Sequence, residues 1–264
     1  RPTAVIGGGP AGLTAAMVLK ERGFHPVLFD AARRLGGTLN VADKGLGKDK
    51  ITRFIDSLIA QARETGIDLH LGEEATVAKV QALAPSGVFI ACGARPFIPP
   101  VPGIDGGNVV LAEEVLLHPA EAKGECVIIG SGMTGLETAE VVLKSGHRTT
   151  IADLLPEIGA GADMMTILDA KQRMAPHDPT YLPGHKLVRI TPAGVEFECL
   201  ATGLPVQVAA DTVILALGVR PQTELVARFK AAFPEAHVLG DAARGGRVVD
   251  ATQDAYGQAF VYEP

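Results

Sequence analysis

Two glycine-rich turns of one pattern lie in this sequence, and each follows directly after a short apolar run. The first turn is Gly7-Gly8-Gly9-Pro10-Ala11-Gly12, and the second is Gly130-Ser131-Gly132-Met133-Thr134-Gly135. After each turn come a helix-like stretch, a second apolar run and an acid, which is Asp30 in the first copy and Asp153 in the second. In both copies the acid lies 18 residues after the last glycine of the turn.

The chemistry that suits such a turn is the binding of a dinucleotide. The first glycine allows a tight strand-to-helix turn, the second lets the backbone approach a pyrophosphate, and the third lets the helix pack on the strand. The phosphates then meet free N–H groups at the positive end of the helix, and the acid accepts hydrogen bonds from ribose hydroxyls. One such turn also occurs in ordinary loops, but the complete unit found twice predicts two nucleotide sites.

Two dinucleotide sites in one chain favour the passage of electrons between two bound nucleotides, most simply a nicotinamide and a flavin. Hydride transfer of this kind needs stacking and orientation, and its chemistry belongs to the cofactors. No Ser–His–Asp arrangement, paired carboxylate system or activated cysteine stands out in the sequence. We therefore expect no catalytic acid or base among the side chains.

The elements that position the turns must be those of an α/β protein with many tight turns. The chain has 264 residues, of which 47% are hydrophobic, with 31 Gly, 18 Pro and no Trp. This is enough for one large domain or two smaller ones. The net charge is −6, and no basic cluster indicates a nucleic-acid partner. No apolar run reaches the ~18 residues that span a bilayer, and no signal-peptide pattern is present, so we expect no membrane partner.

The three cysteines, Cys92, Cys126 and Cys199, are scattered and odd in number, which is typical of a reducing, cytoplasmic compartment. None of them forms a Cys-x-x-Cys pair, so we expect neither a redox-active disulfide nor a protein-borne zinc or iron–sulfur site. The seven histidines show no metal-ligand spacing. We therefore predict no metal site in this chain.

Periodicity and turn residues give the coarse order of the elements. Apolar positions at helical spacing predict a helix over residues 50–65, after a glycine-rich loop at residues 33–47. The linker Pro99–Gly103 cannot continue regular structure and ends the first part of the chain. Beyond it, a short helix is expected at Ala112–Leu117, and residues 186–209 suit a small antiparallel meander.

Internal similarity indicates how the two units are connected. The segments Val88–Gly93 and Val213–Gly218 resemble each other, since each is an apolar strand ending in glycine and followed by Arg-Pro. Such an echo is expected if the second unit is inserted into the first. The sequence thus predicts an α/β fold with two Rossmann-like, three-layer domains, the first over residues 1–107 and 210–264 and the second, inserted one over residues 108–209.

The motifs of this chain resemble those of a known family. The chain is similar to the C-terminal FAD/NAD(P)-binding module, of pyridine nucleotide-disulfide oxidoreductase type, of the NADH:flavin oxidoreductase and 2,4-dienoyl-CoA reductase family. The segments that carry the resemblance extend over nearly the whole chain and are Ala4–Leu13, Arg34–Asn40, Gly135–Glu140, Leu155–Gly159, Ala216–Pro221 and Gly240-Asp241.

The resemblance implies FAD in the first domain and NADH, with NADPH as the alternative coenzyme, in the second. The implied FAD-binding residues are Gly7, Gly9, Pro10, Ala11, Gly12, Asp30, Arg34, Gly36, Gly37, Thr38, Ala75, Cys92, Gly93, Gly240 and Asp241. The implied coenzyme-binding residues are Gly130, Gly132, Met133, Thr134, Gly135, Glu137, Asp153 and Gly218.

Several of these residues carry a specific expectation beside a plainer alternative. By resemblance Asp241 contacts the ribityl chain of FAD, whereas an N-cap aspartate is the alternative. Glu137 is implied to face the nicotinamide, or else to be an interior helix acid with a basic partner. Arg34 belongs to the implied adenosine–pyrophosphate cradle, or else to a basic surface loop. Cys92 is expected to be a small residue at a strand end rather than a nucleophile.

The implied function is the passage of a hydride from NAD(P)H to FAD, as in an NAD(P)H-dependent flavin oxidoreductase. Family members usually precede this module with a TIM barrel that carries FMN and a 4Fe–4S cluster. Because the sequence lacks an initiator Met and starts one step before a strand, we expect a fragment whose partner is such an N-terminal barrel. A homo-oligomer is left open.

Two alternatives to this function remain. In relatives such as the trimethylamine and histamine dehydrogenases the module only holds ADP, so the fold can persist without electron transfer. A free-standing reductase similar to the small subunit of glutamate synthase is the other alternative, although the motif at Arg34–Asn40 argues against it. The chain also departs from the family at Cys92, where Thr is frequent, at Thr38, where Gln is frequent, and over residues 175–185.

The choice of coenzyme follows from the second acid. A carboxylate at Asp153 accepts a hydrogen bond from a free ribose 2′-OH but repels a 2′-phosphate, and NADP sites tend to place Arg nearby. No Lys or Arg occurs between Asp153 and Lys171. The sequence therefore predicts a preference for NADH.

Overall fold

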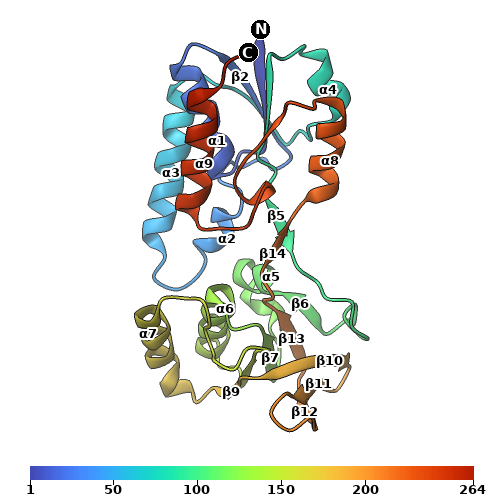
Figure 1. Ribbon diagram of the computed structural model, residues 1–264. Helices are drawn as coiled ribbons and strands as arrows, with labels where there is room; N and C mark the ends of the chain where they lie inside the picture. The colour runs from blue at the N-terminus through green and yellow to red at the C-terminus, as the bar shows by residue number, and fades with distance from the viewer. The chain divides into compact units, whose positions relative to one another are not determined.

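The computed structural model describes residues 1–264, which form two compact units. Unit 1 comprises residues 1–43, 48–95 and 219–264, and unit 2 comprises residues 44–47 and 96–218. The chain leaves unit 1 through β5 (Ala94–Pro96) and returns through β14 (Val219–Pro221), and these two short strands pair with each other (Figure 1). The insertion of the second unit into the first is thereby confirmed.

Unit 1 is a parallel sheet between two layers of helices. Its strands are β1 (Pro2–Ile6), β2 (His25–Asp30), β3 (Asp68–Leu71), β4 (Gly87–Ile90) and β15 (His237–Val238). Its helices are α1 (Pro10–Glu21), α2 (Leu39–Ala42), α3 (Asp49–Glu64), α4 (Val77–Ala82), α8 (Thr223–Ala232) and α9 (Val248–Val261). The sheet order is β15-β4-β1-β2-β3, with α1, α3 and α9 on one face and α4 and α8 on the other (Figure 1).

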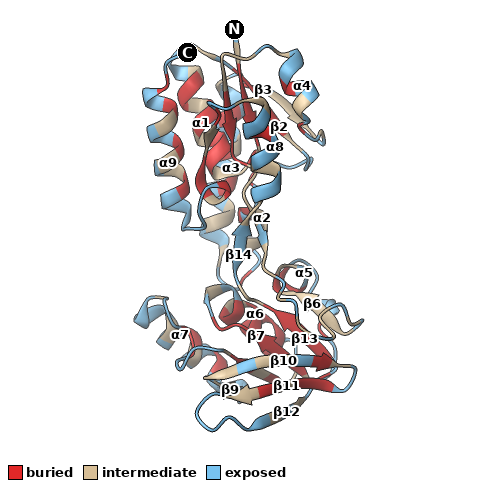
Figure 2. Cartoon of the chain, turned by 45° about the vertical axis from the view of Figure 1, so that its right-hand side comes forward, coloured by how far each residue is buried: buried red, intermediate tan, exposed pale blue.

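Alternate side chains of β1 serve the two cores of unit 1, because successive side chains of a strand point to opposite faces. Val5 packs in one core with Ala255 of α9. Ile6 packs in the other core with Val80 of α4 and Phe229 of α8. All of these side chains are buried, and Figure 2 shows that burial is concentrated along the sheet. The glycine turn after Ile6 is therefore anchored from both faces.

Unit 2 has three layers of different kinds: helices, a parallel sheet and an antiparallel sheet. The parallel strands are β6 (Val109–Leu111), β7 (Cys126–Ile129), β8 (Thr149–Ala152), β9 (Thr180–Leu182) and β13 (Thr212–Leu215). The antiparallel strands are β10 (His185–Thr191), β11 (Gly194–Cys199) and β12 (Pro205–Ala209). The helices are α5 (Ala112–Leu117), α6 (Met133–Lys144) and α7 (Met164–Met174).

The parallel sheet of unit 2 has the order β6-β13-β7-β8-β9, and the antiparallel sheet has the order β10-β11-β12. Ile128 of β7 packs on one face with Leu136 of α6. Its neighbour Ile129 packs on the opposite face with Phe197 of β11. The two parallel sheets confirm the predicted α/β fold with Rossmann-like units, and the meander expected near residues 186–209 forms the third layer.

The predicted domain boundaries need a correction at both crossings. The expected boundaries after residue 107 and before residue 210 place the segment of β13 in the first domain. In the structure β13 pairs with β6 and β7, so it belongs to unit 2. The echo between Val88–Gly93 and Val213–Gly218 has another origin: β4 and β13 occupy the same place in their sheets, each beside the strand that carries the glycine turn.

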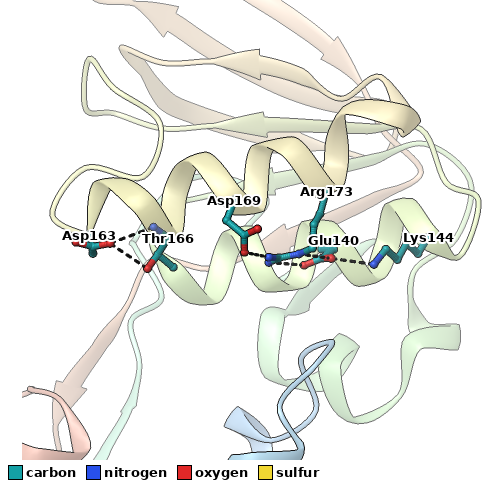
Figure 3. A network of polar contacts seen from close by, with 6 residues as sticks. All are labelled: Glu140, Lys144, Asp163, Thr166, Asp169 and Arg173. Carbon is teal, nitrogen blue, oxygen red and sulfur yellow. Dashed lines mark hydrogen bonds and ion pairs between the residues drawn. The ribbon is translucent and has the colours of Figure 1, made fainter.

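Helices α6 and α7 are joined by a cluster of charged side chains (Figure 3). The carboxylate of Glu140, whose side chain is only 3% exposed, accepts from Lys144 Nζ at 2.9 Å and from Arg173 Nε at 2.8 Å. Arg173 also pairs with Asp169 one turn earlier. Burial opposes the ionisation of Glu140, but hydrogen bonds from Arg173 and Lys144 outweigh it, so the pKa of Glu140 lies below its ordinary value.

Several short elements were not predicted, among them the strands β5, β6 and β14. The loop at residues 33–47 contains the single-turn helix α2, and α4 and β9 occur where no regular element was expected. Each of them is too short to show a clear period in the sequence. None of the helices has the length and apolar character that a membrane crossing requires.

Candidate nucleotide-binding sites

The first glycine turn follows β1 and requires glycine at two positions for steric reasons. Gly7 adopts a positive φ of 107°, and its N–H donates to the carbonyl of Phe29 at 2.8 Å. A Cβ at Gly7 would overlap the carbonyl oxygen of Ala91 in β4's continuation, and a Cβ at Gly12 would overlap the carbonyl oxygen of Gly7. Helix α1 can therefore pack this closely on the turn only with glycine at both positions.

The second turn repeats this geometry after β7. Gly130 has a φ of 102°, and its N–H donates to the carbonyl of Ala152 at 2.8 Å. A Cβ at Gly130 would overlap the carbonyl oxygen of Ala216, and a Cβ at Gly135 would overlap that of Gly130. The two turns thus have the same constraints at corresponding residues.

Both predicted acids are fixed beside their turns by backbone N–H groups. Asp30 accepts from Gly8 N at 2.6 Å on Oδ2 and from Ala32 N at 2.7 Å on Oδ1. Asp153 accepts from Ser131 N at 2.6 Å on Oδ2 and from Leu155 N at 2.9 Å on Oδ1. Since a carboxylate has about four acceptor positions, each acid keeps capacity for a ribose hydroxyl.

The helices that start at the two turns have no side-chain cap. Gly9 and Gly132 are the N-cap residues of α1 and α6, and neither helix has an acid in its first turn. In contrast, α4 is capped by Thr76 and α7 by Asp163, whose Oδ1 accepts from Thr166 N at 3.1 Å. The first N–H groups of α1 and α6 are thus available to an anion, as a pyrophosphate site requires.

In unit 1 the turn opens into a cavity of about 600 Å³. Among the predicted FAD-binding residues, those that line this cavity are Gly7, Gly9, Pro10, Ala11, Asp30, Gly37, Thr38, Ala75, Cys92, Gly93 and Asp241. The structure therefore gathers residues from five separate parts of the sequence around one space. Such a concave site is the usual form of a small-molecule pocket.

Two predicted residues stand behind the cavity wall rather than on it. Gly12 supports the turn from within α1, as described above. Gly36 is buried, and its N–H donates to the carbonyl of Gly8 at 2.8 Å. Both residues shape the turn without facing the cavity.

Two other predicted FAD-binding residues, Arg34 and Gly240, do not line the cavity of unit 1. Arg34 forms an exposed ion pair with Asp56 at 3.5 Å, and it does not line the cavity. Gly240 is buried, and its N–H donates to Asp254 Oδ2 at 2.9 Å. The structure thus favours the surface-loop alternative for Arg34 and a supporting place for Gly240.

Backbone glycines give the cavity a shape that suits a bulky polar ligand. Gly37 has a φ of 54°, and a Cβ there would lie 2.9 Å from the Cα of Gly9 in the turn. Gly93 has a φ of 71°, with nothing within 4 Å of the place that a Cβ would occupy. Side chains at these positions would fill the space beside the turn, so the cavity fits a dinucleotide that lies along the backbone.

Sequence reasoning missed further lining residues. Arg95, Gln222 and the segment Gly246–Val248 also line the cavity, and α9 begins in that segment. Gln222 Nε2 donates to the carbonyl of Cys92 at 2.6 Å, in the segment that follows β4. The glycine pair Gly245-Gly246 before α9 could have indicated that this segment lines the cavity. In contrast, nothing in the sequence indicates that Gln222 reaches Cys92.

Two lining side chains have shifted pKa values. Burial raises the pKa of Asp241, and the nearby Asp250 carboxylate adds to the rise, although Gly246 N–H donates to Asp241 at 3.0 Å. Burial also raises the pKa of the Cys92 thiol, against a smaller opposing effect of Arg95. A thiol with a raised pKa is a poor nucleophile, which agrees with a wall position for Cys92.

In unit 2 the predicted coenzyme residues lie around the start of α6. Gly132 precedes the helix in open space, Met133 and Thr134 form its first turn, and half-buried Glu137 lies one turn further along. Gly218 follows β13 with a φ of 79°. Together with Gly130, Gly135 and Asp153 they reproduce the plan of the first turn.

Known proteins share this arrangement. Residues 1–253 match the family described as pyridine nucleotide-disulphide oxidoreductase. An NADH oxidase of Thermoanaerobacter brockii is 31% identical over 264 residues, covering 97% of this chain and 40% of that protein. A bilirubin reductase of Mediterraneibacter gnavus is 35% identical over 217 residues, covering 82% of this chain and 34% of that protein.

Among solved structures, a 2-naphthoyl-CoA reductase in complex with 2-naphthoyl-CoA superposes with a TM-score of 0.92 at 26% identity. The match covers 100% of this chain and 40% of the other. This chain thus spans about two fifths of the length of such relatives. The resemblance inferred from the motifs is confirmed, and the chain belongs to the pyridine nucleotide-disulphide oxidoreductase family.

Proposed function

We propose that this chain is the electron-input module of a flavin-dependent oxidoreductase, with FAD in unit 1 and NADH in unit 2. The observation that carries the proposal is the repeated turn: two uncapped helices, each beside a carboxylate held by two backbone N–H groups. Bound together, the two cofactors would supply hydride transfer from nicotinamide to flavin. The relatives named as an NADH oxidase and as reductases support this direction of electron flow.

In unit 1 the protein would bind and orient FAD. The first N–H groups of α1 would hold the pyrophosphate, and Asp30 would accept from the adenosine ribose. Gly37 and Gly93 leave room along the cavity. Asp241, which lines the cavity and is half-buried, would bond a hydroxyl of the ribityl chain.

In unit 2 the protein would bind NADH reversibly, as a coenzyme that is exchanged in each turnover. The first N–H groups of α6 would hold its pyrophosphate, and Asp153 would accept from its ribose. Glu137 and Gly218 are the proposed contacts on the nicotinamide side. No side chain of either unit is proposed to act as an acid or base.

Electrons would then leave for a domain that this sequence does not contain. The relatives are about two and a half times longer than the matched part, which supports a partner domain in the same protein. By family resemblance we propose an N-terminal TIM barrel with FMN and a 4Fe–4S cluster. Its substrate would be the final electron acceptor. Three free cysteines support a reducing, cytoplasmic setting.

The test is anaerobic titration of the purified, FAD-loaded chain with NADH, followed by the flavin absorbance. We expect FAD to be retained through desalting and bleached by NADH. Asp153→Ser should slow the bleaching while FAD stays bound. Retention of ADP in place of FAD, with no bleaching, would instead identify a nucleotide-binding module without electron transfer. Failure to bind any nucleotide would overturn the proposal.

A further inference from the structure

We propose that Ser131 is a positioning residue that fixes Asp153 and thereby makes unit 2 select a coenzyme without a 2′-phosphate. This inference rests on the proposed function of unit 2. Ser131 is fully buried. Its Oγ donates to Asp153 Oδ2 at 2.6 Å, beside the bond of 2.6 Å from its own N–H to the same oxygen. One residue therefore holds one carboxylate oxygen with two donors.

The same hydroxyl also ties down the loop that follows Asp153. Ser131 Oγ accepts from Gly159 N at 3.0 Å. Gly159 has a φ of 86° and lies against α7, since a Cβ there would be 2.8 Å from the side chain of Ile167. The turn, the acid and the loop 154–161 are thus joined at a single buried oxygen.

The corresponding place in unit 1 is built differently. Gly8 has no side chain, and Gly36 N–H donates instead to the backbone carbonyl of Gly8 at 2.8 Å. A Cβ at Gly8 would lie 2.5 Å from Leu35 Cδ2 and 2.8 Å from Asp30 Oδ2. The first turn therefore has no space for a hydroxyl, whereas the second uses one.

The hydroxyl changes what each acid can offer. Of about four acceptor positions on a carboxylate, Asp30 uses two, one on each oxygen. Asp153 uses three, because both positions on Oδ2 are taken by Ser131. Asp153 is left with one position on Oδ1 and little freedom to rotate. A fixed carboxylate accepts one ribose hydroxyl and repels a phosphate, and this repulsion is the source of the selectivity.

The segment around Asp153 supplies no Lys or Arg of its own, and the group that bonds the Asp153 carbonyl, at 2.8 Å, is the backbone N–H of His185. Arg148 precedes β8 at the end opposite to Asp153 and pairs with Glu125 at 3.0 Å. The next basic residue, Lys171, lies over the ring of Tyr181 at 5.5 Å. Between these two positions the sequence has neither Lys nor Arg.

The test measures the dissociation constants of NAD⁺ and NADP⁺ by calorimetry on the purified chain. In the unaltered chain NAD⁺ should bind at least about tenfold tighter than NADP⁺. In Ser131→Ala this ratio should fall by roughly tenfold, since Asp153 loses a charge-assisted hydrogen bond and can turn away. Ser145→Ala is the matched control, because its hydroxyl bonds Val141 O at the far end of α6, and it should leave the ratio unchanged.

A double-mutant cycle separates positioning from general damage. In an Asp153→Ser background, Ser131→Ala should not change the ratio further. If Ser131→Ala fails to fold, Ser131→Gly, which copies the first turn, takes its place in the cycle. An unchanged ratio in a folded variant overturns this inference alone. No binding of either coenzyme by the unaltered chain overturns the proposed function and the inference with it.

Discussion

The two glycine turns agree in backbone and differ in the side chains around it. Gly7, Gly12 and Asp30 have counterparts at a constant offset in Gly130, Gly135 and Asp153, with the same overlaps and the same N–H bonds to the acids. Among the differing positions are Gly8 against Ser131 and, on the following helices, Met17 against Glu140. Backbone geometry thus sets what is bound, and the variable side chains set how it is held.

The differences suit the two proposed roles. Asp30 keeps two acceptor positions and borders a cavity of about 600 Å³, which favours a cofactor that stays. Asp153 keeps one, because Ser131 takes the others, which favours a coenzyme that is exchanged. The comparison can therefore be tested by substitutions at the shared glycines, at the two acids and at the side chains that differ.

The largest effect is expected at the third glycine of each turn. Gly12→Ala or Gly135→Ala would place a Cβ against a backbone carbonyl that cannot move cheaply. Each should destabilise its own unit by at least about 3 kcal/mol, measured by hydrogen exchange of peptides from that unit. Gly132→Ala is the control, since nothing lies within 4 Å of its Cβ position. A similar loss in Gly132→Ala would show that crowding is not the cause.

A smaller effect is expected when the first acid is removed. Asp30→Ala should weaken FAD binding by about 1–3 kcal/mol, because a ribose hydroxyl and the N–H groups of Gly8 and Ala32 lose their acceptor. Fluorescence titration of the desalted chain with FAD gives the difference. Asp56→Ala, which removes an exposed acid, is the control. Unchanged FAD affinity in Asp30→Ala would make Asp30 a surface acid.

The charged cluster under α6 exists in unit 2 only, since Met17 occupies the place of Glu140 in unit 1. Glu140→Gln should destabilise unit 2 by about 1–2 kcal/mol, a modest value because Arg173 and Lys144 are partly exposed and can rehydrate. Chemical denaturation monitored by hydrogen exchange in α6 and α7 measures it. Asp169→Asn, an exposed partner of Arg173, should change little.

The difference in stability between the unaltered chain and Glu140→Gln should depend on pH, and the direction follows from the pKa of Glu140. The pKa of Glu140 is lowered in the folded chain from a reference of 4.5, so its stabilisation is fully present above that pH. It is lost as the pH falls through the lowered pKa. The gap between the unaltered chain and Glu140→Gln should therefore close on acidification, and a gap that widens would contradict the assignment.

The smallest effect is expected at Arg34. Its ion pair with Asp56 is exposed, and it lies off the cavity wall, so Arg34→Ala should change FAD affinity by less than about 1 kcal/mol. The same fluorescence titration serves as the measurement. A loss as large as that of Asp30→Ala would show that Arg34 reaches the cofactor after all.

The sequence predicted those features whose cause is local. The helix expected at residues 50–65 is α3, one residue earlier, and the one expected at Ala112–Leu117 is α5. Their periods and end residues are contained in the segment itself. The glycine positions of both turns were predicted from their spacing in the sequence, although Gly7 and Gly130 also lie against the distant carbonyls of Ala91 and Ala216.

Features that depend on distant contacts were not predictable. The place of β13 is decided by its neighbours β6 and β7, which the echo with β4 could not reveal. Gln222 reaches Cys92, and Arg173 reaches Glu140, only after the fold has formed. Ser131 has the appearance of an ordinary turn residue until its three hydrogen bonds are seen.

The central claim is that one chain holds two nucleotides through two separate acids. Native mass spectrometry of the chain with FAD and NAD⁺ tests it most directly, on the unaltered protein and on Asp30→Ala and Asp153→Ala. We predict one retained FAD and one reversibly bound NAD⁺, with Asp30→Ala losing FAD and Asp153→Ala losing NAD⁺. A single nucleotide per chain, or the loss of the same nucleotide from both variants, would contradict the account.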